Sequence, residues 1–413
     1  MAGVARPPPV LASASDMSGT VRPNTRTQGK VEPGGGVTTR PRIAVAHDWL
    51  CGLRGGELVL DRVLEVLARE GVQLAGLYTM FADGAPLTRA IDDAPKTVSR
   101  PGRLPLASTR LRRWMLPLYP RMVEELSARL AEEHARRKID LLISTSSAAI
   151  KGMRAPAGVP HLCYIHAPAR YIWSLGEEYE RGSPLRAAGL RRYRDKFKAW
   201  DLATAANVTR FVANSTHTAG EVKRCYGRQA EVLFPPVRTD YFTPAPGPGH
   251  RGDEWLVVCA LEPYKRVDLA IAAAGAAKAS LVVVGDGSER GALERLAGPG
   301  VRFMGRISKE RLRHLYRTAR LMVFPQVEDF GISACEALAC GMPVVARRAG
   351  GALDIVDDSC GAFFEEADAG SIAQAAARCP RDEGACRRRA ERFAAGVFDA
   401  GLVAIVREMI GSA

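Results

Sequence analysis

The sequence lacks the features that define several classes of protein. No apolar run reaches the ~18 residues of a membrane-spanning helix, and the N-terminus has no hydrophobic segment typical of a secretory signal. The nine cysteines form no C-x-x-C pair, and none falls into zinc-ligand spacing with the seven histidines. We therefore expect a soluble or peripheral cytosolic protein with reduced core thiols.

The composition is that of a globular protein. The chain has 413 residues, of which 47% are hydrophobic and 25% charged, which suggests two or three domains. Residues 1–40 are rich in Pro, Gly, Ser and Thr with little aromatic content, so we predict a disordered extension there.

Strand and helix patterns alternate along the rest of the chain. RIAVAHDWL begins a strand-loop-helix unit, and IDLLIST, HLCYIHA and TRFVANS continue the series. A linker with five prolines follows Glu231, and WLVVCA, SLVVVGDGS, VRFMG, ARLMVFP and GMPVVA then form a second series. This pattern predicts an α/β protein of two doubly wound, Rossmann-like domains across a cleft, over 41–245 and 246–385. A helical segment, 386–413, is expected to pack back on the first domain.

Glu328 and Glu336 flank a predicted strand-to-helix turn, FPQVEDFGISACEALACGMPVV. One interpretation is a capping box, since Ser333 and Glu336 fit S-x-x-E. The other is an anion site, because the amides of Phe330, Gly331 and Ile332 would point at one spot from a helix N-terminus. The Asp-Phe-Gly of this turn has no H-R-D loop before it and is treated as unrelated to kinases.

Charged and glycine-rich turns follow two further predicted strands. Lys265 and Arg266 would place cations where charge develops on a departing diphosphate, although a solvated basic pair is the plainer interpretation. Gly285, Asp286 and Gly287 form a possible phosphate turn, but GDGSERG holds only the first two glycines of the dinucleotide fingerprint at the right spacing.

These motifs together resemble glycosyltransferase family 4, the retaining enzymes of GT-B fold. LEPYKRVDLAI, FMGRISKERLRHLY and VEDFGISACEALACGMPVV resemble its C-terminal domain. HDWLCGLRGGELVL and CYIHAPARYIW resemble the N-terminal domain of a bacterial mannosyltransferase-like branch. The resemblance implies a nucleotide-diphosphate sugar donor in the C-terminal domain and an acceptor on the N-terminal domain.

The resemblance also implies roles for single residues. Glu328 would bind a sugar hydroxyl, Glu336 the nucleotide ribose, and Lys265 the departing diphosphate. The family usually has an arginine where this sequence has Ala260. The Gly285 turn, together with Arg306 and Ile307, would border the nucleotide.

In the N-terminal domain, the resemblance implies that His166 contacts the donor sugar, although a lone histidine at a strand end is more often structural. Gly55 and Gly56 would approach the donor phosphate or the acceptor. Acceptor contacts are expected from six residues: Asp48, Arg54, Glu57, Arg170, Tyr171 and Trp173.

The expected reaction is hexosyl transfer, with mannose from GDP-mannose as the first choice, to a lipid-linked or saccharide acceptor in cell-surface polysaccharide synthesis. No D-x-D motif appears, so we expect transfer without a metal or cofactor, the cations and helix ends neutralising the diphosphate. No carboxylate nucleophile is nominated, which favours same-face substitution within an ion pair. A nucleotide-sugar epimerase of the same fold and a non-catalytic sugar-binding homologue remain alternatives.

The net charge of +13 suggests an anionic partner. The stretch 100–122 has six arginines and no acid, and 181–198 has seven basic residues against one acid, with Trp, Tyr and Leu interleaved. No nucleic-acid module accompanies this charge, so we expect peripheral binding to the inner face of the cytoplasmic membrane, with a solvated basic surface as the alternative. No obligate protein partner is evident.

Overall fold

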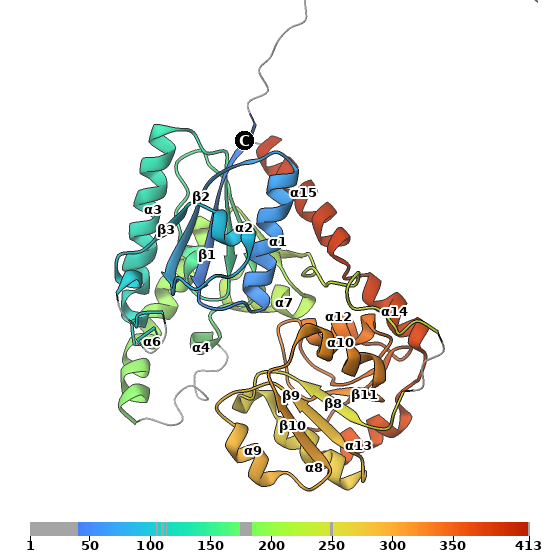
Figure 1. Cartoon of the computed structure of the whole chain (residues 1–413). Helices are drawn as coiled ribbons and strands as arrows, with labels where there is room; N and C mark the ends of the chain where they lie inside the picture. Colours follow the sequence, from blue (N-terminus) through green and yellow to red (C-terminus); the bar gives the residue numbers. More distant parts are fainter. Residues whose placement is uncertain are drawn as a thin grey trace, which may run out of the picture. The chain divides into compact units, whose positions relative to one another are not determined.

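The computed structural model describes residues 40–104, 106–108, 111–112, 114–173, 184–247 and 251–411; the predicted disordered extension lies outside them apart from its last residue. In this part of the chain, two parallel β-sheets are each covered by helices on both faces (Figure 1). The predicted α/β class, with two doubly wound, Rossmann-like halves, is confirmed.

The first sheet has seven strands in the order β3-β2-β1-β4-β5-β6-β7. They are β1 (Arg42–Leu50), β2 (Gln73–Ala82), β3 (Lys96–Val98), β4 (Leu141–Ser146), β5 (His161–Ile165), β6 (Arg210–Ala213) and β7 (Ala230–Val232). The central strand β1 pairs with β2 and β4 along its two edges, and helices cover both faces of the sheet, so the strand is buried almost throughout.

The second sheet has six strands in the order β10-β9-β8-β11-β12-β13. They are β8 (Trp255–Val258), β9 (Leu281–Val284), β10 (Val301–Gly305), β11 (Leu321–Phe324), β12 (Val344–Arg347) and β13 (Gly361–Phe364). In each sheet the strand order reverses once, between β1 and β4 and between β8 and β11. Such reversals open a crevice at the carboxyl ends of the strands, which is where ligands bind in this architecture.

The helices divide between the two sheets. Those of the first half are α1 (Gly55–Arg69), α2 (Arg89–Asp93), α3 (Tyr119–Arg136), α4 (Arg170–Trp173), α6 (Pro184–Thr204) and α7 (Thr216–Tyr226). Those after β8 are α8 (Val267–Ala276), α9 (Arg290–Leu296), α10 (Lys309–Thr318), α11 (Ile332–Ala339), α12 (Ala352–Ile355), α13 (Ala369–Arg378), α14 (Glu383–Glu391) and α15 (Ala395–Gly411).

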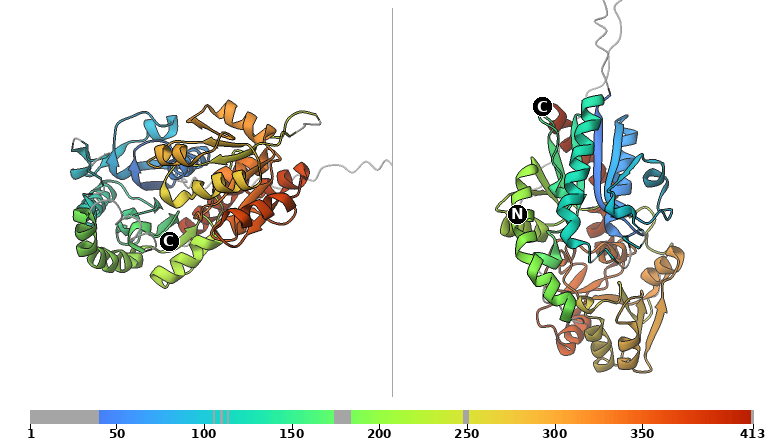
Figure 2. Two further views of the ribbon diagram at one scale, coloured as in Figure 1. Left: turned by 90° about the horizontal axis from the view of Figure 1, so that it is seen from below. Right: turned by 90° about the vertical axis from the view of Figure 1, so that its left-hand side faces the viewer.

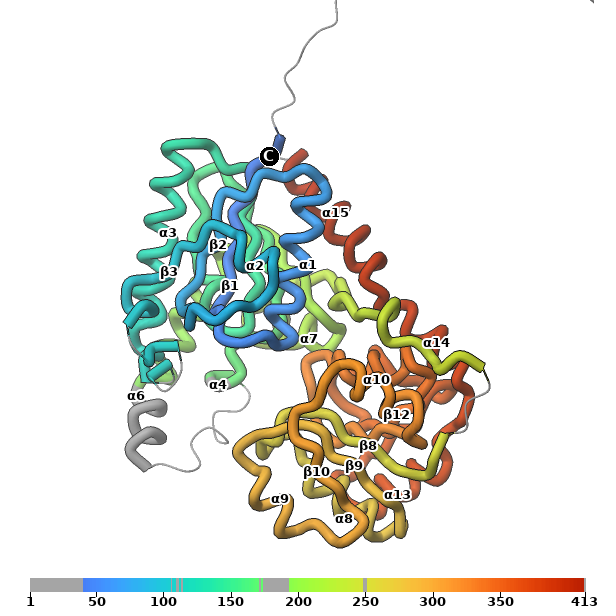
Figure 3. The backbone as a smooth tube through the Cα atoms, viewed as in Figure 1, coloured from blue at the N-terminus to red at the C-terminus, as the bar shows by residue number. Residues whose placement is uncertain are grey.

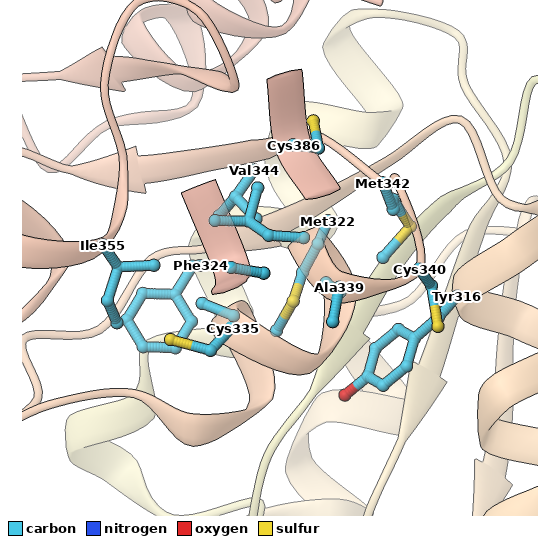
Figure 4. Close-up of a cluster of buried hydrophobic side chains, with 14 of the residues drawn as sticks. Tyr316, Met322, Phe324, Cys335, Ala339, Cys340, Met342, Val344, Ile355 and Cys386 are labelled. Carbon is cyan, nitrogen blue, oxygen red and sulfur yellow. The ribbon is translucent and has the colours of Figure 1, made fainter. Parts of the chain in front are cut away.

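Alternate residues of the central strands feed the cores on opposite faces. In β1, Ile43 and Val45 pack with α1 and α15, whereas Ala44 and Ala46 pack with α3. Figure 2 shows α3, in teal, running beside the blue strands of the first sheet. In the second sheet, one face packs on α10, α11 and α14, and the other on α8 and α13. Figure 4 shows the first of these cores, with side chains of β11, α11 and α14 in contact.

The last two helices belong to different halves. Cys386 and Ala390 of α14 lie in the core of the second sheet. Phe398 and Leu402 of α15 lie in the core of the first sheet, beside α1 (Figure 3). The predicted boundary between 385 and 386 therefore falls inside α14, and within the predicted C-terminal segment only α15 packs on the first half.

Candidate functional site

His166 lies at the carboxyl edge of the first sheet, directly after β5. Its Nε2 atom is buried and has no hydrogen-bond partner in the described part of the chain. A Cβ atom added to Gly56 would lie 3.7 Å from this Nε2 and 3.5 Å from Cε1 of His47. Gly56 thus lets the start of α1 approach both rings, and the predicted glycine loop and His166 come together.

His47 is a site residue that the sequence interpretation missed. Its Nδ1 lies 2.6 Å from the hydroxyl oxygen of Thr145 and 3.1 Å from the carbonyl oxygen of the same residue. Burial lowers the pKa of His47 to about 4. The pKa of His166 is lowered to about 3, mainly by burial and to a smaller extent by the nearby His47. Both rings are therefore neutral at pH 7 and act as hydrogen-bonding groups, not as cations.

Asp48 is not an acceptor contact, and this prediction is corrected. The side chain is fully buried, and its two carboxylate oxygens accept hydrogen bonds at 2.6 to 2.9 Å from four successive amides, those of residues 147–150. The carboxylate holds the turn after β4 in place, where no acceptor hydroxyl reaches it.

Glu57 and Arg54 lie at the start of α1. The Oε2 atom of Glu57 accepts from the backbone amide of Arg54 at 3.1 Å, which caps the helix. The Oε1 atom is buried and lacks a hydrogen-bond partner among the described residues. Burial raises the pKa of Glu57 to about 7, so this carboxyl is partly protonated near neutrality. Its acceptor role stays a prediction, in addition to the capping role.

Lys265 and Glu328 meet at the reversal point of the second sheet. Lys265 ends a short 3₁₀ helix (Pro263–Lys265) after β8, Glu328 follows β11, and their side chains form an ion pair. Both are mostly buried, with 11% and 17% of the side chains exposed. Burial is the main reason that the pKa of Lys265 falls to about 8. The two predicted catalytic residues of this half therefore share one poorly solvated spot.

The turn that follows leads into α11, which begins at Ile332 with Gly331 as its N-cap. Gly331 has φ of +126°, and a Cβ there would lie 2.9 Å from the Phe324 ring and 3.3 Å from Ile355, two side chains labelled in Figure 4. The predicted helix start at Phe330, Gly331 and Ile332 is thus present next to Glu328.

The capping-box interpretation of Glu336 is wrong. Ser333 lies inside α11, one residue past its start, and therefore cannot be the N-cap. The Oε2 atom of Glu336 accepts from the Tyr316 hydroxyl at 3.3 Å, and burial raises the pKa of Glu336 to about 7. Its binding of a ribose stays a prediction.

The glycines after β9 have a packing role. A Cβ on Gly285 would lie 1.8 Å from the carbonyl oxygen of Cys259, and one on Gly287 would lie 2.4 Å from that of Leu261. These glycines let the turn pack against the chain that leads from β8 to Lys265. Asp286 and Arg306 are exposed, and Ile307 packs against the core of the second sheet. Whether the turn also binds a nucleotide stays a prediction.

Arg266 does not join the site in this structure. It adopts a left-handed conformation with φ of 51°, and its guanidinium group binds Asp268 of its own helix α8 at 3.0 Å. Ala260 is exposed and supplies no charge. The donor-binding role of Arg266 stays a prediction.

Residues of the two halves touch at the predicted site. Arg170, at the start of α4, forms an ion pair of 3.3 Å with Asp329. The sequence analysis had given Asp329 no role in the site. A Cβ on Gly55 would lie 3.4 Å from Cδ1 of Ile332 at the start of α11. The glycine loop of one half thus borders the helix start of the other.

Of the remaining predicted acceptor residues, Trp173 donates its indole N–H to Asp201 at 2.7 Å, so that this group is used internally. The side chain of Tyr171 lies outside the described residues.

Four buried polar atoms without a hydrogen-bond partner in the described ranges lie after strand ends or at the start of α1. They are Glu57 Oε1, His166 Nε2, Asn214 Oδ1 and Gln326 Oε1. Arg42 Nε and Trp255 Nε1, at the starts of β1 and β8, are also buried without a hydrogen-bond partner in these ranges, so the feature is not confined to strand ends.

Two doubly wound sheets, with Lys265 and Glu328 paired after strand ends of the second and His166 after a strand end of the first, define the GT-B class of architecture. Two family models match the chain, "Glycosyltransferase Family 4" over residues 53–241 and "Glycosyl transferases group 1" over residues 247–395. The chain belongs to glycosyltransferase family 4.

Among curated relatives, the chain is 30% identical over 236 residues to D-inositol 3-phosphate glycosyltransferase of Mycolicibacterium smegmatis, covering 52% of each chain. It is 32% identical over 257 residues to the GDP-mannose-dependent alpha-(1-6)-phosphatidylinositol monomannoside mannosyltransferase of the same organism, covering 54% of this chain and 64% of that one. The chain spans about half the length of the curated relatives it matches.

Solved structures show the same fold at lower identity. Sucrose-phosphate synthase from Thermosynechococcus elongatus superposes with a TM-score of 0.71 at 19% identity, covering 91% of this chain and 100% of that one. Anabaena Alr3699/HepE in complex with UDP gives 0.63 at 17% identity, covering 89% and 100%.

Two further findings concern the described residues alone. They contain no group of three or more His, Cys, Asp or Glu side chains that could hold a metal ion. Among their helices, none has both the length and the apolar character needed to span a bilayer.

Proposed function

We propose that this protein transfers a hexose, with retention of anomeric configuration, from a nucleotide-diphosphate sugar to a lipid-linked or saccharide acceptor in cell-surface polysaccharide synthesis. The observation that carries the proposal is the Lys265–Glu328 pair beside the start of α11, at the reversal point of the second sheet. GDP-mannose is the first donor to test, because a relative at 32% identity is GDP-mannose-dependent.

In the proposed reaction, the bond between the anomeric carbon and the diphosphate oxygen breaks, and its electron pair stays on the diphosphate. Lys265 and the amides at the start of α11 offset this charge. The acceptor hydroxyl attacks from the same face, and its proton passes to the departing phosphate oxygen. Glu328 would hold a sugar hydroxyl, and the neutral His166 would accept from or donate to another.

We propose that this reaction needs no metal ion. The support is the charge available at the proposed site: Lys265 and the N-terminus of α11 are both positive and can offset the charge of a diphosphate. Activity that survives EDTA treatment is the expected result, and activity restored only by added Mg²⁺ or Mn²⁺ would contradict it.

An anionic membrane surface is the proposed location of the acceptor. Between Arg100 and Met122, the described residues include large apolar side chains that are mostly exposed, among them Leu104, Leu106 and Trp114, at 56%, 59% and 57%. Exposed apolar side chains among arginines suit the interface of an anionic bilayer. Of the basic residues proposed for this surface, Arg110, Arg113 and Arg181 lie outside the described residues.

Incubating the purified protein with a panel of nucleotide sugars, with and without membrane lipid extract, tests the proposal. Transfer that requires the extract supports it. Isomerisation of the donor without transfer would instead indicate an epimerase, and inertness throughout would indicate a non-catalytic sugar-binding protein.

A further inference from the structure

Two neighbouring carboxylates on the turn after β11 each hold a cation from a different part of the chain. Glu328 pairs with Lys265, and Asp329 pairs with Arg170 at 3.3 Å. Lys265 comes from the second half, whereas Arg170 comes from α4 of the first half. The turn therefore brings two cations from distant segments to one place.

The two cations also share an aromatic neighbour. The Nζ atom of Lys265 lies 4.9 Å from the centre of the Tyr264 ring, and the guanidinium carbon of Arg170 lies 5.8 Å from the same centre. Burial is the largest cause of the lowered pKa of Lys265, and the positive charge of Arg170 also contributes. Each cation is balanced by one carboxylate, and a ligand that carries more than one negative charge can take the place of both carboxylates at once.

We propose that Arg170 is the second cation that binds the diphosphate of the donor, positioned by an anchor at the far end of α4. The inference rests on the proposed function, since it concerns the same donor. The inference replaces the acceptor role expected for Arg170. Arg170 would supply the positive charge that is missing at Ala260, whereas the charge of Arg266 is paired with Asp268. A guanidinium fork suits a diphosphate, because two parallel N–H groups can bind two phosphate oxygens.

The anchor is a buried polar network at the last residue of α4. Trp173 donates its indole N–H to Asp201 at 2.7 Å, and the Tyr226 hydroxyl donates to the same carboxylate at 2.9 Å. Lys151 pairs with Asp201 at 2.9 Å, and both side chains are almost completely buried. Since α4 has only four residues, holding Trp173 at its last position also fixes the backbone position of Arg170 at its first.

Nucleotide binding to the intact protein tests the proposal without knowledge of the acceptor. Affinities for GDP, UDP, ADP and dTDP, and for the matching nucleosides, are measured by titration calorimetry. Arg170→Gln should weaken binding of the preferred diphosphate about tenfold or more and leave nucleoside binding unchanged. Arg170→Lys should recover part of the loss. The matched control is Arg302→Gln, which removes an arginine paired with Glu254 on the edge strand β10.

A second variant avoids any dependence on the folding of Arg170→Gln. Asp329→Asn keeps Arg170 but removes the carboxylate that competes for it, so diphosphate affinity should rise or stay the same. A tenfold loss of affinity in this variant would overturn the proposal, as would unchanged diphosphate binding in Arg170→Gln.

The anchor is tested by Trp173→Phe, which keeps an aromatic ring but loses the hydrogen bond to Asp201. Diphosphate binding should weaken while nucleoside binding does not, and a purely structural role would weaken both or neither. If the unaltered protein bound none of the four diphosphates, the proposed function itself would fail, and this inference with it.

Discussion

Lys265 and Glu328 depend on each other, because each is a mostly buried charge whose partner is the other. Breaking such a pair leaves one charge uncompensated, which costs more than the pair contributes. A substitution at either position must therefore be followed in stability as well as in kinetics.

Glu328→Gln tests the proposed contact with the donor sugar. We expect kcat to fall ~10²-fold or more, a loss of roughly 3 kcal/mol of transition-state stabilisation, with the fold retained. Steady-state kinetics and thermal unfolding are measured together. Glu294→Gln, on the exposed side of α9, is the control, and near-normal kinetics in Glu328→Gln would refute the assignment.

The pH dependence of transfer tests Lys265. The pKa of this lysine is lowered to about 8, so the ammonium form is present below that pH and is lost as the pH rises through it. We expect kcat to fall above about pH 8, and Lys265→Arg to remove this fall, because arginine stays charged.

Lys265→Ala should lower kcat more than it raises the donor KM, since charge on the diphosphate grows in the transition state. A pH profile that is the same in Lys265→Ala as in the unaltered protein would show that another group titrates.

At the scale of elements, α11 shows how a sequence motif can predict the wrong N-cap residue for a helix. Ser333 and Glu336 fit a capping box that would start the helix at Ala334, but the helix starts two residues earlier, at Ile332, with Gly331 as its N-cap close to Phe324 and Ile355. Packing under the turn, which local sequence does not report, decided where the helix begins.

Gly331→Ala tests this element. A Cβ at φ of +126° would meet the Phe324 ring at 2.9 Å, so we expect a loss of about 1–3 kcal/mol in unfolding free energy and reduced donor binding. Gly275→Ala in α8 is the control, because nothing lies within 4 Å of its Cβ. There we expect a gain of up to about 1 kcal/mol, measured by chemical denaturation.

For the whole molecule, the last helix links the chain terminus to the site in the first half. Phe398 of α15 contacts Tyr164 of β5 edge-on at 5.7 Å between ring centres, and Tyr164 contacts His166 at 5.3 Å. The C-terminal helix therefore completes the packing behind a predicted catalytic residue.

Phe398→Ala is expected to destabilise the protein by about 3–5 kcal/mol, because it removes a large, fully buried side chain. Thermal or denaturant unfolding measures this loss. Val397→Ala, at a neighbouring position that is 53% exposed, should change stability by less than about 1 kcal/mol. Equal effects at both positions would argue against the packing of α15 on β5.

Reversing the basic surface tests membrane binding by the whole molecule. Changing Arg110, Arg112 and Arg113 to Glu should release the protein from anionic liposomes while donor binding is unchanged. The control with the same change in charge replaces three exposed arginines of the second half, Arg295, Arg302 and Arg311. If the control variant were released from the liposomes equally, the net charge of the protein, and not this surface, would account for membrane binding.

Much of this protein followed from its sequence alone. Alternating strand and helix patterns determined the two doubly wound sheets, because hydrophobic periodicity and turn residues are local properties. Motifs after strands located Lys265, Glu328, Gly331 and His166, since strand ends in such sheets carry the ligand loops. Four strands were not named: β3, β7 and β13, which have only three or four residues each, and β2, which is a ten-residue strand that the sequence analysis missed.

Only the tertiary structure decided how the strand-end residues are used. Asp48 near the end of β1 and Glu57 in the first turn of α1 are both buried acids, yet four amides of a distant turn enclose Asp48, whereas Glu57 Oε1 lacks a hydrogen-bond partner among the described residues. Likewise, the pairing of Arg170 with Asp329 and of Trp173 with Asp201 joins segments far apart in sequence. Such contacts depend on how the sheets and helices pack, and a local pattern carries no record of which distant group will meet a given side chain.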